Sequence, residues 1–212
     1  MTSDDRHYLL RKLHSLSGIV PVGLFLLQHI YHNAFAIQGR DAYGRVTEDL
    51  QNIPYAIFLE VGLIWLPILF HALYGFYVLF TGQNNTRHYG HMKNWMYVLQ
   101  RISGAFLFFY ILFHVTETWG TRAKGPEMYD VMKHSLENPY IFIFYIVGMT
   151  AAVFHFSNGI WTFFLSWGIV IGPKSQRIAG YACLVFGVIL LLTGINSLLA
   201  FRGQAFHFGS EG

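Results

Sequence analysis

The chain has 212 residues, of which 54% are hydrophobic and only 12% are charged, and its formal net charge is +3. Charged residues make up about a quarter of a typical soluble domain, so this composition argues against a soluble globular protein. The small, dispersed basic excess argues against a nucleic-acid partner. The single cysteine, Cys183, excludes an internal disulfide, a c-type haem attachment and an iron–sulfur cluster held by this chain alone.

Five long apolar segments follow one another along the chain, and each can cross a hydrocarbon core of about 30 Å. We expect spans near residues 13–37, 55–81, 96–118, 140–167 and 177–201. Polar stretches separate them, and no cleavable signal peptide is expected before the first. The predicted fold is an all-α integral membrane domain over residues 1–212, with five transmembrane helices and four of them in one bundle.

Prolines mark several places in these spans. Pro54 and Pro139 stand at the starts of two spans, where proline is tolerated. Pro21 and Pro67 lie inside spans and are expected to kink them.

The basic residues give the expected orientation. If the N-terminus is inside, the inner segments carry eight basic and two acidic residues, against six basic and nine acidic residues outside. Because basic residues in short loops favour the inner side, we expect a multi-pass protein of the cytoplasmic membrane with a cytoplasmic N-terminus.

An internal repeat singles out four histidines. The stretches "FHALYGFY" and "FHFSNGIW" place Phe, His, Gly and a final aromatic at matching positions, with His71 and His155 84 positions apart. The stretches "SGIVPVGLFLLQH" and "SGAFLFFYILFH" end at His29 and His114, 85 positions apart. Spans one and two thus resemble spans three and four, as in a parallel repeat about an axis normal to the membrane.

A histidine inside a membrane span is costly and requires a reason. Each of the four lies about 15 to 18 residues into its span, and neighbouring spans enter from opposite sides. His29 and His114 therefore share an outer depth, whereas His71 and His155 share an inner depth, about 10 to 15 Å away along the membrane normal. The sequence predicts two pairs of histidines at two levels.

Paired imidazoles from facing helices are what haem b requires, since each supplies one axial ligand to the iron. Gly75 and Gly159 follow His71 and His155 by one helical turn on the same face, so we expect them to leave clearance for the haem. The sequence therefore predicts two haem b groups, with the four histidines as iron ligands.

Other interpretations of these histidines remain open. Intramembrane histidines often pack helices or line a pore, so a haem-free transporter or scaffold is the alternative from another class. Zinc bound by four histidines is disfavoured because the two levels lie too far apart. His32 competes with His29 as a ligand, although its repeat counterpart is Glu117. The other histidines are expected at surfaces or interfaces: His7, His14, His88, His91, His134 and His207.

Two stacked haems would form an electron path across most of the bilayer, which needs a source and a sink. The chain has no GxGxxG fingerprint of a dinucleotide or flavin domain. It is therefore expected to be the membrane anchor of a larger complex.

Four stretches, "RKLHSLSGIVPVGLFLLQH", "HALYGFYVLFTGQNN", "MKNWMYVLQRISG" and "FHFSNGIWTFFLSWGI", resemble the cytochrome b558 anchors of succinate dehydrogenase. The resemblance is to the Gram-positive, menaquinone-linked type and extends from about Arg11 to Phe201. It implies five spans and two haems b that carry electrons to menaquinone. It also implies a flavoprotein partner, which oxidises succinate on FAD, and an iron–sulfur partner.

The resemblance also assigns ligands and contacts. It implies that His29 and His114 hold the distal haem and that His71 and His155 hold the proximal haem. It further implies that the N-terminus and the inner loop "TGQNNTRHYGHMKN" contact the iron–sulfur subunit.

The quinone site has two candidate places. Glu60, in the outer part of span two, could exchange protons with menaquinol or could instead reach the interface or cap a helix. The inner end offers an alternative group that could equally bind haem propionates or lipid headgroups: His14, Ser17, Arg101 and Ser103. A fumarate reductase running in reverse, or the cytochrome b of a hydrogenase or formate dehydrogenase, are the alternatives of similar chemistry.

Overall fold

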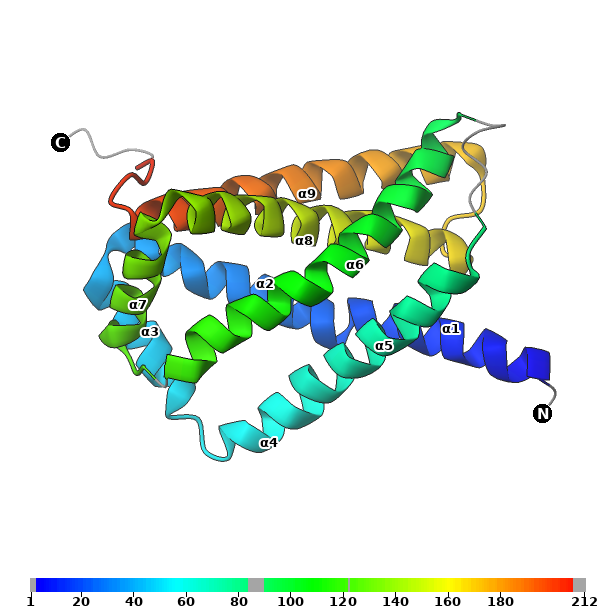
Figure 1. Cartoon of the computed structure of the whole chain (residues 1–212). Coiled ribbons are helices and arrows are strands. Elements are labelled where there is room, and N and C mark those ends of the chain that lie inside the picture. Colours follow the sequence, from blue (N-terminus) through cyan, green and yellow to red (C-terminus); the bar gives the residue numbers. More distant parts are fainter. Residues whose placement is uncertain (1–2, 84–89, 122, 208–212) are drawn as a thin grey trace.

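The computed structural model describes residues 3–83, 90–121 and 123–207, and the elements in these ranges are all helical (Figure 1). Within these described ranges, five helical segments are long and apolar enough to cross a membrane. Their bounds are Asp4–Gln38, Ala56–Thr81, Met92–Thr121, Pro139–Ser166 and Pro173–Phe201. The predicted all-α, five-span fold is confirmed, and the first span begins earlier than expected.

The first span is interrupted once, at the predicted proline. Helix α1 (Ser3–Ile19) ends just before Val20, and α2 (Pro21–Ala34) begins with the proline itself. A proline is tolerated at the first position of a helix because its missing N–H would have no partner there. A short 3₁₀ turn, η1 (Phe35–Gln38), completes the span.

The second span also changes its winding beside a proline. Helix α4 (Ala56–Glu60) leads into a π-helical turn, η2 (Val61–Trp65), and then into α5 (Leu66–Thr81), whose second residue is Pro67. Proline removes one backbone donor and crowds the preceding turn, so the wider turn accommodates the ring without ending the span. The predicted distortion is therefore a π-turn.

The remaining spans are single long helices. They are α6 (Met92–Thr118) with the 3₁₀ turn η3 (Trp119–Thr121), α8 (Pro139–Ser166) and α9 (Pro173–Phe201). The side chain of Asn138 caps α8 by accepting hydrogen bonds from the first free backbone N–H groups of the helix. Long helices satisfy their own backbone groups, which is what a lipid environment requires.

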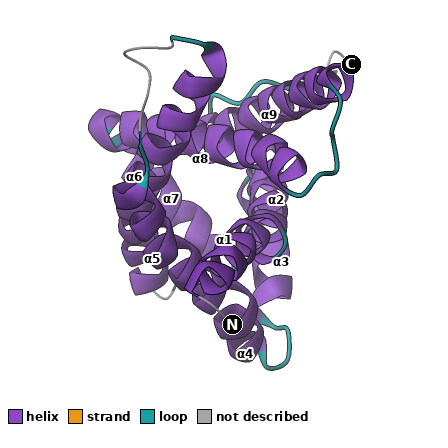
Figure 2. Ribbon diagram, turned by 90° about the vertical axis from the view of Figure 1, so that its right-hand side faces the viewer, coloured by secondary structure: helices purple, strands orange, loops and turns teal. Residues whose placement is uncertain are grey.

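The spans of the two repeat halves surround a common axis. Viewed along the bundle, the α1–α2 segment, α5, α6 and α8 form a ring, and α9 lies outside it (Figure 2). Helix α9 packs mainly against α8 and α2. The fifth span is thus additional to the four-helix arrangement, as the repeat predicted.

Two helices that the sequence analysis treated as loops cover one end of the bundle. Helix α3 (Arg40–Gln51) follows span one, and α7 (Pro126–Glu137) precedes span four. Both lie at the end opposite the N-terminus (Figure 1). We call this the capped end, and the other, where Ser3 lies, the N-terminal end. Each cap helix buries one apolar face and exposes a polar face, as surface helices do.

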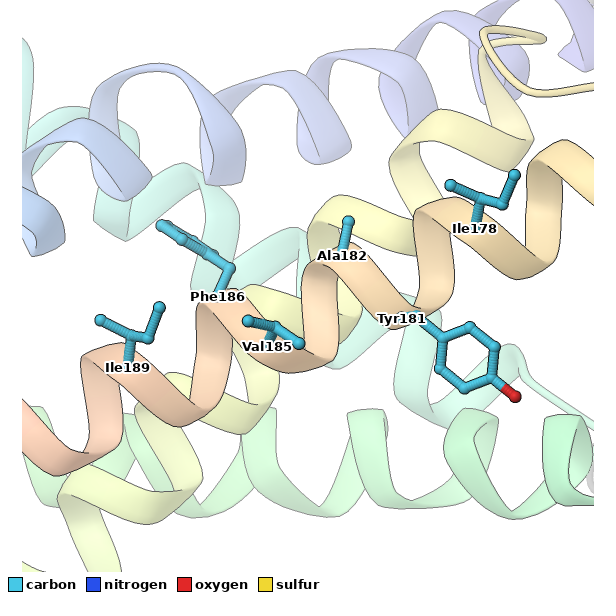
Figure 3. A pocket seen from close by; sticks show the side chains of 6 residues that line it. All are labelled: Ile178, Tyr181, Ala182, Val185, Phe186 and Ile189. Atoms are coloured by element: carbon cyan, nitrogen blue, oxygen red, sulfur yellow. The ribbon is translucent and has the colours of Figure 1, made fainter.

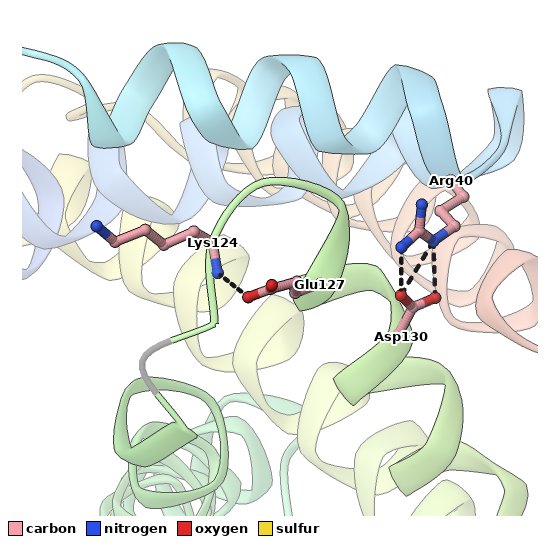
Figure 4. A network of polar contacts seen from close by, with 4 residues as sticks. All are labelled: Arg40, Lys124, Glu127 and Asp130. Carbon is pink, nitrogen blue, oxygen red and sulfur yellow. Dashed lines mark hydrogen bonds and ion pairs between the residues drawn. The ribbon is translucent and has the colours of Figure 1, made fainter.

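Polar contacts join the two cap helices (Figure 4). Arg40 on α3 donates to both carboxylate oxygens of Asp130 on α7, with Nε to Oδ1 at 2.9 Å and Nη2 to Oδ2 at 2.6 Å. At the start of α7, Glu127 accepts a hydrogen bond of 3.3 Å from the backbone N–H of Lys124. The two-point pairing between Arg40 and Asp130 fixes the orientation of α3 relative to α7.

The outward face of α9 forms a shallow apolar groove of about 570 Å³. Figure 3 shows the side chains that line it: Ile178, Tyr181, Ala182, Val185, Phe186 and Ile189. Four of them are 58–64% exposed: Ile178, Tyr181, Val185 and Ile189. A contiguous apolar surface of this kind is unusual in water and suits contact with lipid. None of the predicted haem or quinone residues lines this groove.

Candidate functional site

The four intramembrane histidines stand in two pairs, each with one member from either half of the repeat. The ring centroids of His71 and His155 lie 6.2 Å apart, with planes 88° apart. Those of His29 and His114 lie 5.6 Å apart, with planes 77° apart. Two metal–imidazole bonds of about 2 Å plus half of each ring span roughly 6 Å, so the spacing within each pair is close to that of two imidazoles on one metal ion. These are the pairs that the depth argument places together, and iron ligation stays a prediction.

Both rings of the N-terminal-end pair are anchored through one nitrogen. Nδ1 of His71 lies 2.9 Å from the backbone carbonyl oxygen of His14, and Nδ1 of His155 lies 3.1 Å from that of Gln100. A carbonyl oxygen only accepts, so each Nδ1 carries the proton and each Nε2 keeps its lone pair free. Metal-bound histidines typically show this arrangement, because the second bond fixes the tautomer and the ring orientation.

The two Ser-Gly steps of the repeat lie against the same two rings. Ser17–Gly18 contacts His71, with the serine oxygen 3.5 Å from Nδ1, and Ser103–Gly104 contacts His155, with that distance at 3.1 Å. A Cβ atom on the first glycine would overlap the His71 ring, and one on the second would stand 2.8 Å from Cε1 of His155. The glycines therefore allow each imidazole to lie directly on the neighbouring helix.

Gly75 and Gly159 face polar side chains on the adjacent span. A Cβ at Gly75 would stand 3.3 Å from Nε2 of His14, and one at Gly159 would stand 3.5 Å from Nε2 of Gln100. His14 and Gln100 are thus counterparts in the repeat. The role of these glycines in haem clearance stays a prediction.

The capped-end pair has a different partner. Nδ1 of His114 lies 3.2 Å from the hydroxyl oxygen of Tyr145, which donates a hydrogen bond of 2.5 Å to Oε2 of Glu117. The other oxygen of Glu117 accepts a hydrogen bond from the hydroxyl of Ser135 on α7. Tyr145 was not among the predicted site residues; it lies on span four, seven residues after the α8 N-cap and ten before His155.

His32 turns away from the pair at this end. Its Nε2 lies 2.9 Å from the hydroxyl oxygen of Thr47, and its ring stacks on Tyr43 with centroids 5.1 Å apart. Both partners belong to α3, and burial raises the pKa of Tyr43 to about 12. His32 therefore holds the cap, which leaves His29 as the residue of span one that faces His114.

Three of the four inner quinone candidates contact the N-terminal-end pair: His14 and Ser17 lie against His71, and Ser103 lies against His155. The ring of His14 lies flat on that of His71, with centroids 4.2 Å and planes 8° apart. The guanidinium of Arg101 lies 3.4 Å from the centre of the Tyr97 ring. Within the described residues, Nε of Arg101 and the hydroxyl of Tyr74 are buried polar groups without a hydrogen-bond partner. Buried donors are almost always paired, so this end has unused capacity for a polar ligand.

Glu60 stands apart from that group. It is the last residue of α4, towards the capped end, and it is partly exposed. Among the described residues, nothing forms a hydrogen bond or ion pair with its carboxylate. The two candidate places predicted for quinone are therefore at opposite ends of the bundle. Across the same described ranges, no three His, Cys, Asp or Glu side chains are placed to share one metal ion.

Comparison with known proteins identifies the family. The profile described as "Succinate dehydrogenase/Fumarate reductase transmembrane subunit" matches residues 82–195. The succinate dehydrogenase cytochrome b558 subunit of Bacillus subtilis is 41% identical over 200 residues, which cover 94% of this chain and 99% of the relative. The succinate dehydrogenase hydrophobic membrane anchor subunit of Halobacterium salinarum is 29% identical over 106 residues, covering 50% of this chain and 79% of the relative. The chain belongs to the family of succinate dehydrogenase/fumarate reductase transmembrane subunits.

Proposed function

We propose that this chain is a di-haem electron-transfer anchor, with one haem b between His29 and His114 and another between His71 and His155. The observation that carries the proposal is the pairing itself, together with the acceptor found at Nδ1 of three of the four rings. The name of the Bacillus subtilis relative, a cytochrome b558, supports haem b as the group. When bound there, haem b supplies a one-electron carrier inside the bilayer.

The long helices set the separation between the two sites. Ser103, which contacts His155, and His114 lie eleven residues apart on the uninterrupted helix α6. At 1.5 Å per residue this places the two histidine pairs about 16 Å apart along the helix. The two sites would then cover about half of a hydrocarbon core of roughly 30 Å.

The proposed partners are an iron–sulfur subunit and a flavoprotein with FAD, as the relatives' names imply for a succinate dehydrogenase. The N-terminal end would face the cytoplasm and the iron–sulfur subunit, because it carries most of the basic residues of the short connections. In the loop "TGQNNTRHYGHMKN", predicted to contact that subunit, residues 84–89 lie outside the described residues. Electrons would therefore enter at the N-terminal end.

Menaquinone is the proposed electron acceptor. A quinone needs a hydrogen-bond donor for its carbonyl oxygens and a route for protons. At the N-terminal end, the unpartnered donors of Tyr74, whose ring lies beside that of His14, and of Arg101 are available to the carbonyl oxygens. The carboxylate of Glu60 offers a route for protons at the capped end.

Related activities differ in direction or in partner. A fumarate reductase would use the same chain with electrons running from the quinone, and the family description includes it. The family membership favours a succinate dehydrogenase or a fumarate reductase over the cytochrome b of a hydrogenase or formate dehydrogenase. The full-length match to a succinate dehydrogenase subunit favours succinate oxidation.

A reduced-minus-oxidised spectrum of the purified complex tests the proposal. Two b-type components are expected in the wild type, and neither should remain when His71→Ala and His114→Ala are combined. A complex without b-type bands would favour the haem-free scaffold, and bands that survive the double substitution would show that other residues hold the iron. Copurifying flavoprotein and iron–sulfur subunits would identify the dehydrogenase.

A further inference from the structure

The two histidine pairs differ in what their Nδ1 atoms contact. At the N-terminal end, His71 and His155 donate to neutral backbone carbonyls. At the capped end, His114 instead contacts the hydroxyl of Tyr145, which is bonded to the carboxylate of Glu117. A carboxylate polarises a hydrogen-bonded chain more strongly than an amide does.

The donors and acceptors in the hydrogen-bond series His114–Tyr145–Glu117 have a defined order. The two oxygens of Glu117 accept from the hydroxyls of Tyr145 and Ser135, one at each oxygen. A phenol has a single proton, so once Tyr145 donates it to Glu117 its oxygen can only accept from His114. His114 therefore carries its proton on Nδ1 and keeps Nε2 free to bind iron.

Packing holds the side chains of this hydrogen-bond series in place. Tyr145 is 2% exposed and Ser135 is 9% exposed, so water does not compete strongly for these bonds. The ring of His114 lies between Tyr110, stacked with planes 9° apart, and Tyr145, which meets it at 80°. The imidazole is thus fixed in the orientation that its hydrogen bond requires.

We infer that Glu117, acting through Tyr145, lowers the midpoint potential of the haem held by His29 and His114. The inference rests on the proposed function above. Hydrogen bonding towards a carboxylate raises the basicity of the imidazole, and a more basic axial ligand stabilises ferric over ferrous iron. Both residues are positioning residues, since they act on the iron through His114. Within the described residues, the rings of His71 and His155 have no such carboxylate partner.

A redox titration of the whole purified complex tests this inference, with the two b-type bands followed separately. His29→Ala identifies the capped-end band as the one that it removes. Glu117→Gln should raise the midpoint of that band and leave the other band unchanged. We expect a rise of about tenfold in the ferrous-to-ferric ratio at a fixed potential, which corresponds to about 59 mV for one electron. Glu117→Asp, which keeps the charge, should restore much of the wild-type value.

Glu137→Gln is the matched control. Glu137 lines the same cavity of about 580 Å³ as Glu117, but it is exposed and near His134 rather than bonded to Tyr145. Its substitution removes an equal charge from the same cavity and should leave both midpoints unchanged. Equal shifts in the two Gln variants would show a general charge effect and would overturn the inference.

Tyr145→Phe keeps the test decisive if Glu117→Gln loses the capped-end haem. This variant removes only the hydroxyl and should also raise the midpoint of the capped-end band. If Glu117→Gln keeps both bands with unshifted midpoints, the inference is overturned while the proposed function stands. If Glu117→Gln loses the capped-end haem, the same result in Tyr145→Phe overturns the inference. An absence of b-type bands in the wild-type complex would overturn the proposed function as well.

Discussion

The imidazole of His14 lies flat on that of His71, with ring centroids 4.2 Å apart. In the second half of the repeat, the corresponding place beside His155 is taken by Gln100, whose side chain donates to the backbone carbonyl of His155 at 2.9 Å. In both halves the Nδ1 proton goes to the main chain of this neighbour. The bond that orients each candidate ligand therefore depends on the backbone at this position and is independent of the side chain.

His14→Gln should accordingly leave both haems in place. The variant gives span one the residue that span three already has, and the carbonyl oxygen that receives the His71 proton is kept. Haem content per chain and the two-component difference spectrum should match the wild type. Loss of the proximal component would show that the stacked ring itself is required.

Adding one methyl group at Gly18 or Gly104 should remove the haem of the N-terminal-end pair. The new Cβ would occupy the space of the His71 ring in one variant and would press on Cε1 of His155, at 2.8 Å, in the other. Alanine otherwise stabilises a helix by about 0.5–1 kcal/mol relative to glycine. A loss of haem in these variants would therefore result from the contact with the histidine ring and not from weaker helix propensity. Haem content should fall by about half, with the capped-end component retained.

Gly62→Ala is the control for these glycines. A Cβ at this position would have no neighbour within 4 Å, so both haems should remain. Full haem content in Gly18→Ala and Gly104→Ala would contradict the assigned role of the close contact.

The pair between Arg40 and Asp130 should make the cap sensitive to acid. The hydrogen bond from Arg40 lowers the pKa of the Asp130 carboxyl below its ordinary value of 3.8. A carboxyl with a depressed pKa in the folded state contributes stability above its ordinary pKa and loses it as the pH falls through the depressed value. The α3–α7 contact should therefore be intact at neutral pH and weaken below about pH 4.

Asp130→Asn provides the comparison. In this variant, hydrogen exchange of the α3 and α7 amides should be faster than in the wild type at pH 7, and the difference should shrink as the pH falls below the ordinary carboxyl pKa of 3.8. The effect should be modest, because both side chains are about half exposed. A difference that persists undiminished in acid would mean that the carboxylate charge is not the cause.

The quinone site can be located by opposing substitutions at the two ends. Removing a hydroxyl that a buried ligand uses costs about 1–3 kcal/mol, so Tyr74→Phe should raise the KM for a menaquinone analogue about tenfold if the quinone binds at the N-terminal end. Glu60→Gln should then have little effect on KM. The opposite pattern would place the quinone at the capped end, and haem loss in Tyr74→Phe would assign the hydroxyl to the proximal haem.

The sequence predicted the spans and the histidine pairs well, for a physical reason. Lipid imposes length and apolarity on every crossing segment, and the repeat placed His29 with His114 and His71 with His155 without any contact information. The cap helices were missed because α3 and α7 are polar on average, and their apolar faces become visible only at helical spacing. The predicted function of Gly75 and Gly159 was drawn from spacing within one helix, which does not reveal the neighbouring His14 and Gln100. Tyr145 carried no sequence signal, since its partner Glu117 lies 28 positions away.

The number of haem groups per chain in single histidine variants decides whether the chain holds two separate bis-histidine sites. Two haems per chain are expected in the wild type and in His32→Ala, because the side chain of His32 binds the cap helix α3. His114→Ala and His71→Ala should each retain one haem and lose a different component of the difference spectrum. Two haems in both of these variants, or the same component lost from each, would contradict the assignment of two separate bis-histidine sites.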